Sequence, residues 1–398
     1  MLRFRQLRAA LATASAGSVS GAAREVHTTQ PALTSAISSL EKTLGAPVFS
    51  RSAQGMELTP VGKAFVERVR AAVAHLDGFE RSFGSRRKSR TPFHRLVSES
   101  QLQAYLALCE QGSFVAAARY LGVTQPAISR NMRDLEALAG ISLWRRTGTS
   151  GEPTPEGREL VRAIGVCFRD IELATDAFRE HHGRVDGTLR IGALPLSRSD
   201  WVPNAVIETL KPFPQARISL LDGPYVEQLN ALNHGRVDLI VGALRPESQV
   251  ENVHQVAVFE DTLSIVVRPG HPALDAATNG ATDRDWLAQQ TWILSAPGTP
   301  GRERFLAYLE TLGLSEPHHV IESGSLIATR ALLRASDFAA PLSRRQIRLE
   351  LDAGLLAIVA ADLPATRRSI GITMRQGFQP TKLYGHLIDA LTRTGTLI

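Results

Sequence analysis

The feature that most constrains this chain is a gapless internal repeat, in which residues 7–68 recur 95 positions later. Between positions 17 and 62, 17 of 46 aligned residues are identical, and the identities are evenly spread. They include Thr29-Gln30-Pro31-Ala32, which reappears as Thr124-Gln125-Pro126-Ala127. The repeat is longer than the roughly 20–50 residues of a solenoid unit. We therefore interpret it as one small domain duplicated in full.

Each copy reads as three helices with a tight turn between the second and the third. In the second copy, Leu102, Leu106 and Cys109 follow at intervals of four and three, which predicts a helix with one apolar face. A break at 112–113 and a short helix over 114–121 come next. Thr124 stands at an expected N-cap, and the helix that it opens stops at Gly140. This order predicts a helix-turn-helix, an arrangement typical of DNA readers.

A segment with strand and turn signals follows each third helix, over 46–62 and 141–157. It carries Arg51 in the first copy and Arg145 and Arg146 in the second. Basic side chains at such a place suit a wing that lies along a phosphate backbone. We therefore expect two all-α winged helix-turn-helix domains in tandem.

A long amphipathic helix is predicted after each wing. Its apolar residues follow at intervals of four and three, the spacing of a coiled-coil seam. They are Phe65, Val69, Ala72, Leu76, Phe79 and Phe83 in the first copy, and Leu160, Ile164, Cys167, Ile171, Ala174 and Phe178 in the second. We expect a seam between two chains. The alternative is a helix that packs on its own domain.

The net charge of +6 is unevenly distributed. Residues 1–95 hold 15 Lys and Arg against 6 Asp and Glu, whereas residues 96–185 and 186–398 are close to neutral at −1 and −2. An excess of positive charge at one end of a chain favours an anionic partner such as a nucleic-acid backbone. The alternative is a basic solubilising surface.

Composition excludes several classes of protein. The chain of 398 residues has room for two or three domains. It has no apolar run of 18 residues, so we expect no membrane span, and its arginine-interrupted N-terminus is unlike a secretion signal. The two cysteines, Cys109 and Cys167, lie in different predicted elements, which indicates a reduced, cytoplasmic setting.

The residues of the two repeats resemble the DNA-binding domain of the LysR-type transcriptional regulators. The family pattern runs Gly-Ser-Phe, Ala-Ala, Ser/Thr-Gln-Pro-Ala, Leu-Glu, Gly, an aromatic residue before Arg-Arg, and Thr-x-x-Gly. The second copy follows it almost throughout, with Trp144 at the position of Phe. The first copy departs from it, since Val19 replaces Phe, Thr34-Ser35 replaces Ser-Arg, and Ser38 stands where the second copy has Arg133. The family ordinarily carries one such domain.

The resemblance implies that helices 29–44 and 124–139 read DNA, with their first turns at base edges and the wing arginines on phosphates. In the second copy, Ser129 and Arg130 are expected deeper in the groove. The predicted DNA-binding residues are Thr29, Gln30, Pro31, Arg51, Thr124, Gln125, Pro126, Ser129, Arg130, Arg133, Arg145 and Arg146.

From Gly187 onward, short β-branched runs alternate with helices, which indicates parallel α/β layers. This half resembles the effector-binding domain of the same family, a two-lobed α/β domain built like a periplasmic binding protein. The resemblance rests on "TLRIGALP" at 188–195, "GRVDL" at 235–239, "VVRPGHP" at 266–272 and "RSIGITMR" at 368–375. It places lobe I at 187–263 and 374–398, and lobe II at 264–373.

Ligands of open α/β sheets bind beyond the carboxyl ends of the strands. Hydroxyl groups, helix-start N–H groups and arginines at those positions suit a carboxylate. The alternative is that they are ordinary turn and cap residues. The predicted effector-binding residues are Ser197, Arg198, Ser199, Asp222, Arg245, Ser295, Thr299 and Ser325.

No motif for catalysis or for a cofactor stands out. The pairs His181-His182 and His318-His319 lack further ligands for a metal. The segment "GTPGRER" lacks the Lys-Ser/Thr ending of a phosphate loop, and no motif places a catalytic triad. We therefore expect no enzyme, no metal and no cofactor.

The predicted chain is thus multidomain: winged helix-turn-helix domains at 1–62 and 97–157, linker helices at 63–84 and 158–182, a basic linker at 85–96, and the effector-binding domain at 187–398. Expected partners are double-stranded promoter DNA, a small and anionic effector, RNA polymerase as a further candidate, and a second copy in a homodimer or homotetramer. Two alternatives stay open: one copy serves oligomerisation or protein interaction, or the chain binds a ligand and no DNA.

Overall fold

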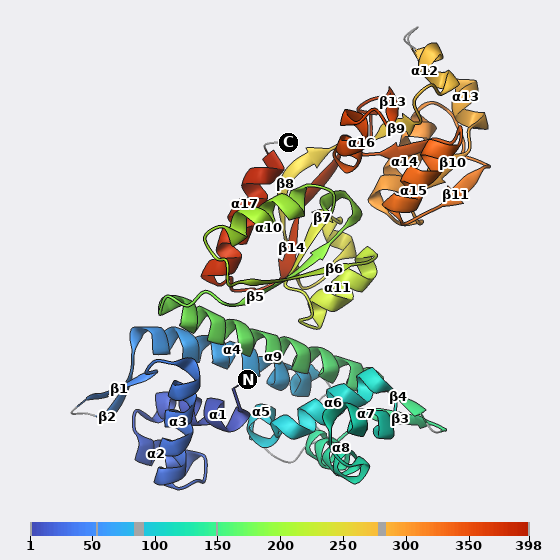
Figure 1. Ribbon diagram of the computed structural model, residues 1–398. Coiled ribbons are helices and arrows are strands. Elements are labelled where there is room, and N and C mark those ends of the chain that lie inside the picture. Colours follow the sequence, from blue (N-terminus) through green and yellow to red (C-terminus); the bar gives the residue numbers. More distant parts are fainter. Residues whose placement is uncertain (1, 53–54, 83–90, 149, 278–283, 397–398) are drawn as a thin grey trace. The chain divides into compact units, whose positions relative to one another are not determined.

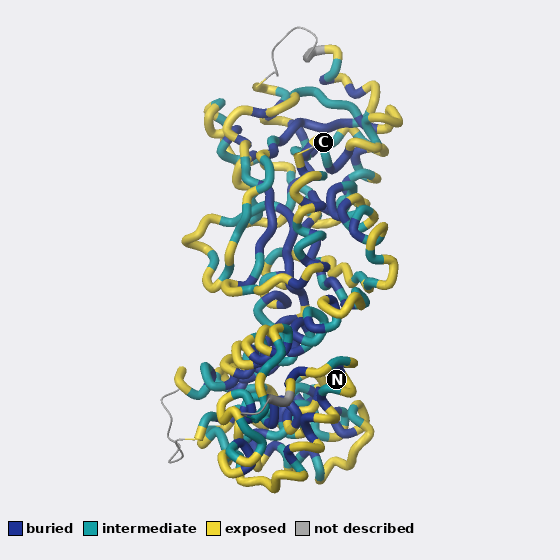
Figure 2. Tube along the Cα trace, turned by 90° about the vertical axis from the view of Figure 1, so that its left-hand side faces the viewer, coloured by how far each residue is buried: buried dark blue, intermediate teal, exposed yellow. Residues whose placement is uncertain are grey.

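The computed structural model describes residues 2–52, 55–82, 91–148, 150–277 and 284–396. The chain divides into two compact units (Figure 1). The N-terminal unit takes the chain up to Gly187, together with 233–236 and 380–382. The C-terminal unit takes the rest. Buried residues fill the interior of each unit (Figure 2).

The N-terminal unit repeats one order of elements twice, three helices, a two-stranded antiparallel sheet and a long helix. The first repeat comprises α1 (Phe4–Ala16), α2 (Val19–Glu25), α3 (Gln30–Leu44), β1 (Phe49–Ser52), β2 (Gly55–Leu58) and α4 (Pro60–Ser82). The second repeat comprises α6 (Glu99–Gln111), α7 (Phe114–Leu121), α8 (Gln125–Ala139), β3 (Trp144–Thr147), β4 (Ser150–Pro153) and α9 (Pro155–His181). Between them, Phe93–Leu96 of the expected basic linker forms a short helix, α5.

Equivalent capping residues begin the equivalent helices. Ser18 and Ser113 accept hydrogen bonds from Gly21 N at 3.1 Å and Ala116 N at 3.2 Å, which caps α2 and α7. Thr59 and Thr154 accept from the N–H groups of Gly62 and Gly157, so that α4 and α9 begin three residues earlier than expected. The hydroxyl of Thr124 makes no such bond, although Thr124 does occupy the N-cap of α8.

A carboxylate ties each third helix to its wing. Glu41 of α3 accepts hydrogen bonds from the N–H groups of Val48 and Phe49, at 2.9 and 3.0 Å. Glu136 of α8, which is the equivalent residue, accepts from Leu143 and Trp144 at 2.8 and 3.2 Å. The repetition in sequence therefore extends to individual hydrogen bonds.

The long helices α4 and α9 lie side by side (Figure 1). The rings of Phe65 and Phe178 meet edge to face with centroids 5.6 Å apart, and the apolar residues of both repeats form one continuous core. This corrects the expectation of a seam between two chains, because the two seams bury one another within one chain. The 4-3 spacing marks a helix face that needs an apolar partner, and it does not identify that partner. Phe83 lies outside the described residues.

The first lobe of the C-terminal unit holds a five-stranded sheet in the order β6-β5-β7-β14-β8. Its strands are β5 (Thr188–Ala193), β6 (Arg217–Asp222), β7 (Leu239–Ala243), β8 (Val253–Asp261) and β14 (Arg368–Arg375). β5 pairs in parallel with β6 and β7, as the strand–helix alternation indicates, whereas β14 runs antiparallel to β7 and β8. The helices of this lobe are α10 (Trp201–Leu210), α11 (Tyr225–Asn233) and α17 (Lys382–Thr396).

The second lobe holds a parallel pair, β10 (Trp292–Leu294) with β11 (Val320–Glu322), and an antiparallel sheet of β12 (Ala340–Leu342), β9 (Ser264–Val267) and β13 (Ala357–Ala360). Its helices are α12 (Pro272–Ala277), α13 (Arg284–Gln289), α14 (Pro300–Thr311), α15 (Leu326–Ala335) and α16 (Arg348–Asp352). The expectation of parallel layers is therefore wrong for the three-stranded sheet. The return to the first lobe begins at Arg368 rather than 374, because all of β14 pairs in the first sheet.

None of the helices that the structure describes is long and apolar enough to cross a membrane. Cys109 is half-buried and Cys167 is buried, and neither forms a disulfide.

Replacing Glu136 with alanine tests the tie between α8 and its wing. The N–H groups of Leu143 and Trp144 lose their acceptor, so we expect local stability to fall by about 1–3 kcal/mol. Amide hydrogen exchange at these two residues measures the change, and Glu110→Ala, an exposed position on α6, is the control. Unchanged exchange in the Glu136 variant would contradict the role of this carboxylate.

Candidate nucleic-acid interface and effector site

The first turns of α3 and α8 present equivalent exposed side chains. Gln30 and Pro31 begin α3, Gln125 and Pro126 begin α8, and all four are exposed. Thr29 and Thr124, the N-cap residues, are exposed too. Because proline has no N–H group to lose in the first turn, it starts the helix without an unpaired donor. Both helices therefore offer a polar tip that is free of tertiary packing, as contact with a base edge requires.

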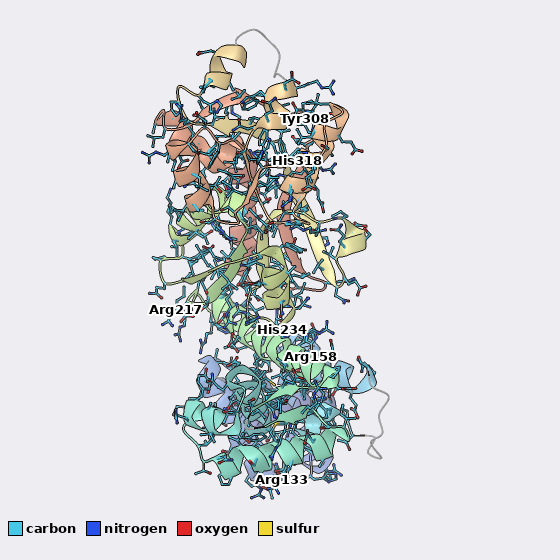
Figure 3. The ribbon with its side chains drawn as sticks, turned by 90° about the vertical axis from the view of Figure 1, so that its right-hand side faces the viewer. Arg133, Arg158, Arg217, His234, Tyr308 and His318 are labelled. Carbon is cyan, nitrogen blue, oxygen red and sulfur yellow. The ribbon has the colours of Figure 1, made fainter. Side chains whose placement is uncertain are left out.

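Two arginines extend the polar face of α8. Arg130 has 80% of its side chain exposed and lies 3.8 Å from Asp134, a weak ion pair on one helix face. Arg133 is exposed and donates to the carbonyl oxygen of Ser129. In the N-terminal unit, Arg133 lies on the side away from α9, to which Arg158 belongs (Figure 3). These guanidinium groups are available for bidentate contacts to guanine or phosphate.

A cavity of about 400 Å³ lies between α8, the start of α7 and the wing strand β3. The guanidinium of Arg146 lies 5.2 Å from the ring centroid of Phe114, which itself meets Trp144 edge to face. The indole N–H of Trp144 is buried and has no hydrogen-bond partner among the described residues. The lining residues are Phe114, Pro126, Ser129, Met132, Arg133, Glu136, Trp144 and Arg146.

The first repeat offers a less charged surface at the same positions. Thr34 and Ser35 stand where α8 has Ser129 and Arg130, and Ser38 stands where it has Arg133. The hydroxyl of Thr34 donates to the carbonyl oxygen of Gln30 at 3.0 Å. The side chain of Arg51, a predicted phosphate contact, lies outside the described residues.

The wing arginines of the second repeat differ in their surroundings. Arg145 is paired with Glu152 on the neighbouring strand, and the guanidinium holds the pKa of that carboxyl below its usual value. Arg146 is exposed, and its guanidinium lies over the ring of Phe114. Arg145 must therefore exchange partners to meet a phosphate, whereas Arg146 need not.

Ser197 does not serve as a ligand donor, which corrects its predicted role. It is fully buried, and its hydroxyl lies within donating distance of the carbonyl oxygens of Leu194 at 2.9 Å and Val241 at 2.8 Å. The hydroxyl therefore holds together the ends of β5 and β7. Position after a strand predicted exposure, but the turn at 195–197 folds the side chain inward.

Arg198 and Asp222, two further predicted effector residues, form an ion pair at 3.0 Å. Arg198 also donates to the carbonyl oxygens of Ala193 and Gly223, so it ties β5 to β6. Ser199 donates to the carbonyl oxygen of Gln346 at 3.2 Å. Each of these three residues therefore has a partner within the protein.

In the second lobe, Ser295 and Thr299 precede α14. Their hydroxyl oxygens lie 2.6 Å apart, and Thr299 also lies within donating distance of the Ala296 carbonyl oxygen. Ser325 caps α15 by accepting from Ala328 N at 3.2 Å. Ser325 therefore has the role of a helix cap.

Arg245 differs from Arg198, the other arginine among the predicted effector residues, because it stacks on an aromatic ring. Its guanidinium lies 4.2 Å from the ring centroid of Tyr225, and its Nη1 is buried with no hydrogen-bond partner among the described residues. Burial lowers the pKa of Arg245, whereas nearby Glu303 raises it. No carboxylate of the described residues lies within ion-pair distance of this guanidinium. Arg245 is thus a half-buried cation whose Nη1 has no acceptor among the described residues.

Glu303 of α14 and Arg368 are near enough to Arg245 for their charges to affect its pKa, and sequence reasoning missed Arg368 as a site residue. An added Cβ at Gly301 would lie 3.0 Å from Arg368 Nη1 and 4.0 Å from Ser295 Oγ. Arg368 in turn pairs with the buried Asp261 at 2.8 Å. We call Tyr225, Arg245, Ser295, Thr299 and Arg368 the Arg245 group. In the sequence, Arg368 is marked only as the first residue of the strand motif "RSIGITMR".

A second cluster of arginines surrounds a cavity that is too small for a metabolite. Its cavity of about 30 Å³ is lined by Ser199, Asp200, Arg330, Arg345, Gln346, Arg348 and Leu349. Arg348 pairs with Asp200 at 3.0 Å, and Arg330 pairs with Glu350 at 2.9 Å. This volume suits about one water molecule. Within the described part of the chain, no cluster of His, Cys, Asp and Glu has the composition of a metal site.

Two protein families match the chain. The one described as "LysR substrate binding domain" matches residues 182–396. The one described as "Bacterial regulatory helix-turn-helix protein, lysR family" matches twice, over 4–63 and over 100–158. The two matches to the second family fall on the two repeats.

Relatives differ in how much of the chain they match. The HTH-type transcriptional regulator GalR of Pseudomonas putida is 31% identical over 372 residues, which cover 94% of this chain and 92% of the relative. The HTH-type transcriptional regulator PcaQ of Agrobacterium fabrum is 27% identical, over 73% of this chain and 92% of its own length. The crystal structure of ArgP from Mycobacterium tuberculosis shares the fold, with a TM-score of 0.58 and 16% identity, and covers 75% of this chain and 97% of its own.

Replacing Ser197 with alanine separates a structural role from a ligand-binding one. The carbonyl oxygens of Leu194 and Val241 lose a donor, so the free energy of unfolding of the C-terminal unit should fall by about 0.5–1.5 kcal/mol. Urea denaturation followed by tryptophan fluorescence measures this change. Ser248→Ala, at an exposed position, is the control. Unchanged stability together with weakened ligand binding would return Ser197 to the ligand site.

Proposed function

Because the chain belongs to the LysR family of bacterial transcriptional regulators, we propose that both of its helix-turn-helix repeats read promoter DNA. Members of this family are DNA-binding regulators that respond to small molecules, and they are not enzymes. What exceeds the family pattern is the second DNA-reading domain. The exposed, equivalent polar tips of α3 and α8 carry this proposal.

The proposed contacts to base edges come from the two recognition helices, α3 and α8. They are Thr29, Gln30, Pro31, Thr124, Gln125, Pro126, Ser129, Arg130 and Arg133. A glutamine bonds to adenine through two hydrogen bonds, and an arginine bonds to guanine in the same way. The proposed phosphate contacts are Arg51, Arg145 and Arg146, on the wings. The positive charge of residues 1–95 adds affinity that does not depend on DNA sequence.

One observation favours a second candidate role for the first repeat. At the positions of Arg130 and Arg133, it has Ser35 and Ser38, which cannot make bidentate contacts to guanine. A repeat that serves oligomerisation or protein interaction would tolerate that loss. The exposed Gln30 and the basic surroundings support DNA reading instead.

We propose an anionic effector bound at the Arg245 group. The half-buried guanidinium of Arg245 has a buried Nη1 without an acceptor, and a ligand carboxylate would accept from it. Ser295 and Thr299 add hydroxyl oxygens at the start of α14, whose free N–H groups suit an anion. Arg245 and Ser295 belong to different lobes, so a ligand that contacts both would shift the equilibrium between lobe arrangements.

We propose that two chains associate through strand β6. It is an edge strand of the first sheet, and its Leu220 and Leu221 are exposed by 50% and 41%. Val226 on α11 and Ile207 on α10 add exposed apolar surface. Two copies of an edge strand pair with one another around a two-fold axis, which covers the backbone groups and the apolar side chains together.

Glutamine-to-alanine substitutions at Gln30 and Gln125 test whether both repeats read DNA. On DNA upstream of its own coding sequence, each substitution should weaken binding by about 1–3 kcal/mol and expose part of the footprint. Gel-shift titration and footprinting at one fixed salt concentration measure this. Gln111→Ala, at the exposed end of α6, is the control. If Gln30→Ala changes neither quantity, the first repeat has the second candidate role.

An Arg245→Gln substitution tests the anionic effector. Acetate, succinate and benzoate are suitable probes, and their neutral amides show whether the negative charge matters. A carboxylate that binds should raise the melting temperature of the wild type, and Arg245→Gln should weaken its binding about tenfold or more. Arg334→Gln, at an exposed position in the last turn of α15, is the control. An equal response to a carboxylate and its amide would refute an anionic effector.

A further inference from the structure

We propose that one chain supplies both halves of a single DNA reader, and that this reader recognises an operator with two unlike half-sites. The inference rests on the proposed function, in which both repeats read DNA. It adds that the two repeats act as a pair within one chain and that their pairing is asymmetric.

The two repeats are related by an approximate two-fold axis at the α4–α9 contact. His75 Nε2 lies 3.0 Å from Asp170 Oδ2, and these residues occupy equivalent positions 95 apart in the chain. Equivalent positions of two helices meet only at a symmetry axis. Phe65 precedes His75 by ten residues, whereas its partner Phe178 follows Asp170 by eight. The helices are therefore antiparallel about that axis.

The pairing leaves the seam residues with no apolar face for another chain. Those described in both helices are at most 6% exposed and belong to one core. They are Phe65, Val69, Ala72, Leu76 and Phe79 of α4, and Leu160, Ile164, Cys167, Ile171, Ala174 and Phe178 of α9. A second chain would have to displace α4 or α9 to use this surface.

The connection between the repeats favours pairing within the chain. The N–H group and Nδ1 of His94 lie 3.1 and 2.8 Å from the carboxylate of Asp77 on α4, and the Phe93 ring lies 5.8 Å from that of Phe79. Arg8 of α1 donates to the carbonyl oxygen of His94 at 2.8 Å. The short connection also gives each repeat a local concentration of its partner on the order of millimolar.

The two reading helices differ where base contacts are most specific. Both begin with Thr-Gln-Pro-Ala, so both half-sites should contain the bases read by Gln30 and Gln125, with adenine preferred. Beyond the first turn, α8 has Arg130 and Arg133, which select guanine, whereas α3 has Ser35 and Ser38. The operator should therefore combine a shared element with guanine on one side only. Such an operator sets the direction in which the chain lies on DNA.

A cross-link tests the pairing in the full-length protein. Cysteines introduced as His75→Cys and Asp170→Cys should be joined by a short bismaleimide, since both native side chains are partly exposed. Cys109 and Cys167 stay in place, because burial raises the pKa of Cys109 to about 12 and that of Cys167 well above its usual value, which leaves both as slowly reacting thiols. The controls are the two variants that carry only one of the introduced cysteines.

The expected product of the double variant is a cross-linked species with the mass of one chain. A product with the mass of two chains would overturn the proposal, and so would the absence of any cross-link when both cysteines react with a monofunctional maleimide. An inter-chain product would leave DNA reading by both repeats untouched, so the two hypotheses fail separately.

Selection of binding sites from a random DNA pool tests the operator. Wild type should select two unlike half-sites, Arg130→Ala with Arg133→Ala should lose guanine in one half only, and affinity should fall roughly ten- to a hundredfold per lost contact. The matched gain-of-function variant, Ser35→Arg with Ser38→Arg, should select guanine in the other half as well. A palindromic wild-type site would overturn the proposal. An intra-chain cross-link with no effect of Gln30→Ala would instead show that the proposed function fails while the pairing holds.

Discussion

The N-terminal unit depends on one interaction, the burial of the apolar faces of α4 and α9 against each other. Each large apolar side chain removed from water contributes about 1.5–3 kcal/mol, so a face several residues long outweighs the ordering of the chain between the helices. The helix-turn-helix elements extend from opposite ends of this pair (Figure 1). Where α3 and α8 stand relative to one another therefore follows from the pairing.

The arginines of this protein fall into two kinds. Those paired with a carboxylate hold the protein together, and those stacked on an aromatic ring remain available to ligands. Arg198, Arg348 and Arg368 each contact a carboxylate, and each ties strands or helices together. Arg146 and Arg245 stack on aromatic rings instead, at 5.2 and 4.2 Å. An arginine on an aromatic ring keeps hydrogen-bonding capacity for an anion, since its donors lie in the plane of the guanidinium. The proposed phosphate and effector contacts use this second kind of arginine.

Much of the local structure could be predicted from the sequence. Thr124 stands at the N-cap of α8 as expected, and Glu41 and Glu136 make equivalent bonds because the repeat preserves the spacing between helix and wing. The effector residues were predicted less well. Position after a strand selected Arg245 and Ser295, but it also selected Ser197, whose hydroxyl is turned inward.

The sequence by itself determined the repeat, the helices and strands, and the family, because capping, periodicity and motif spacing depend on residues close together in the chain. Only the tertiary structure decided which helix covers each seam and which arginine lacks a carboxylate. Both depend on residues brought together across large sequence separations, such as Phe65 with Phe178 and Arg368 with Asp261. The sequence shows that an apolar face or a charged group needs a partner, but only the packing of the folded chain shows which residue that partner is.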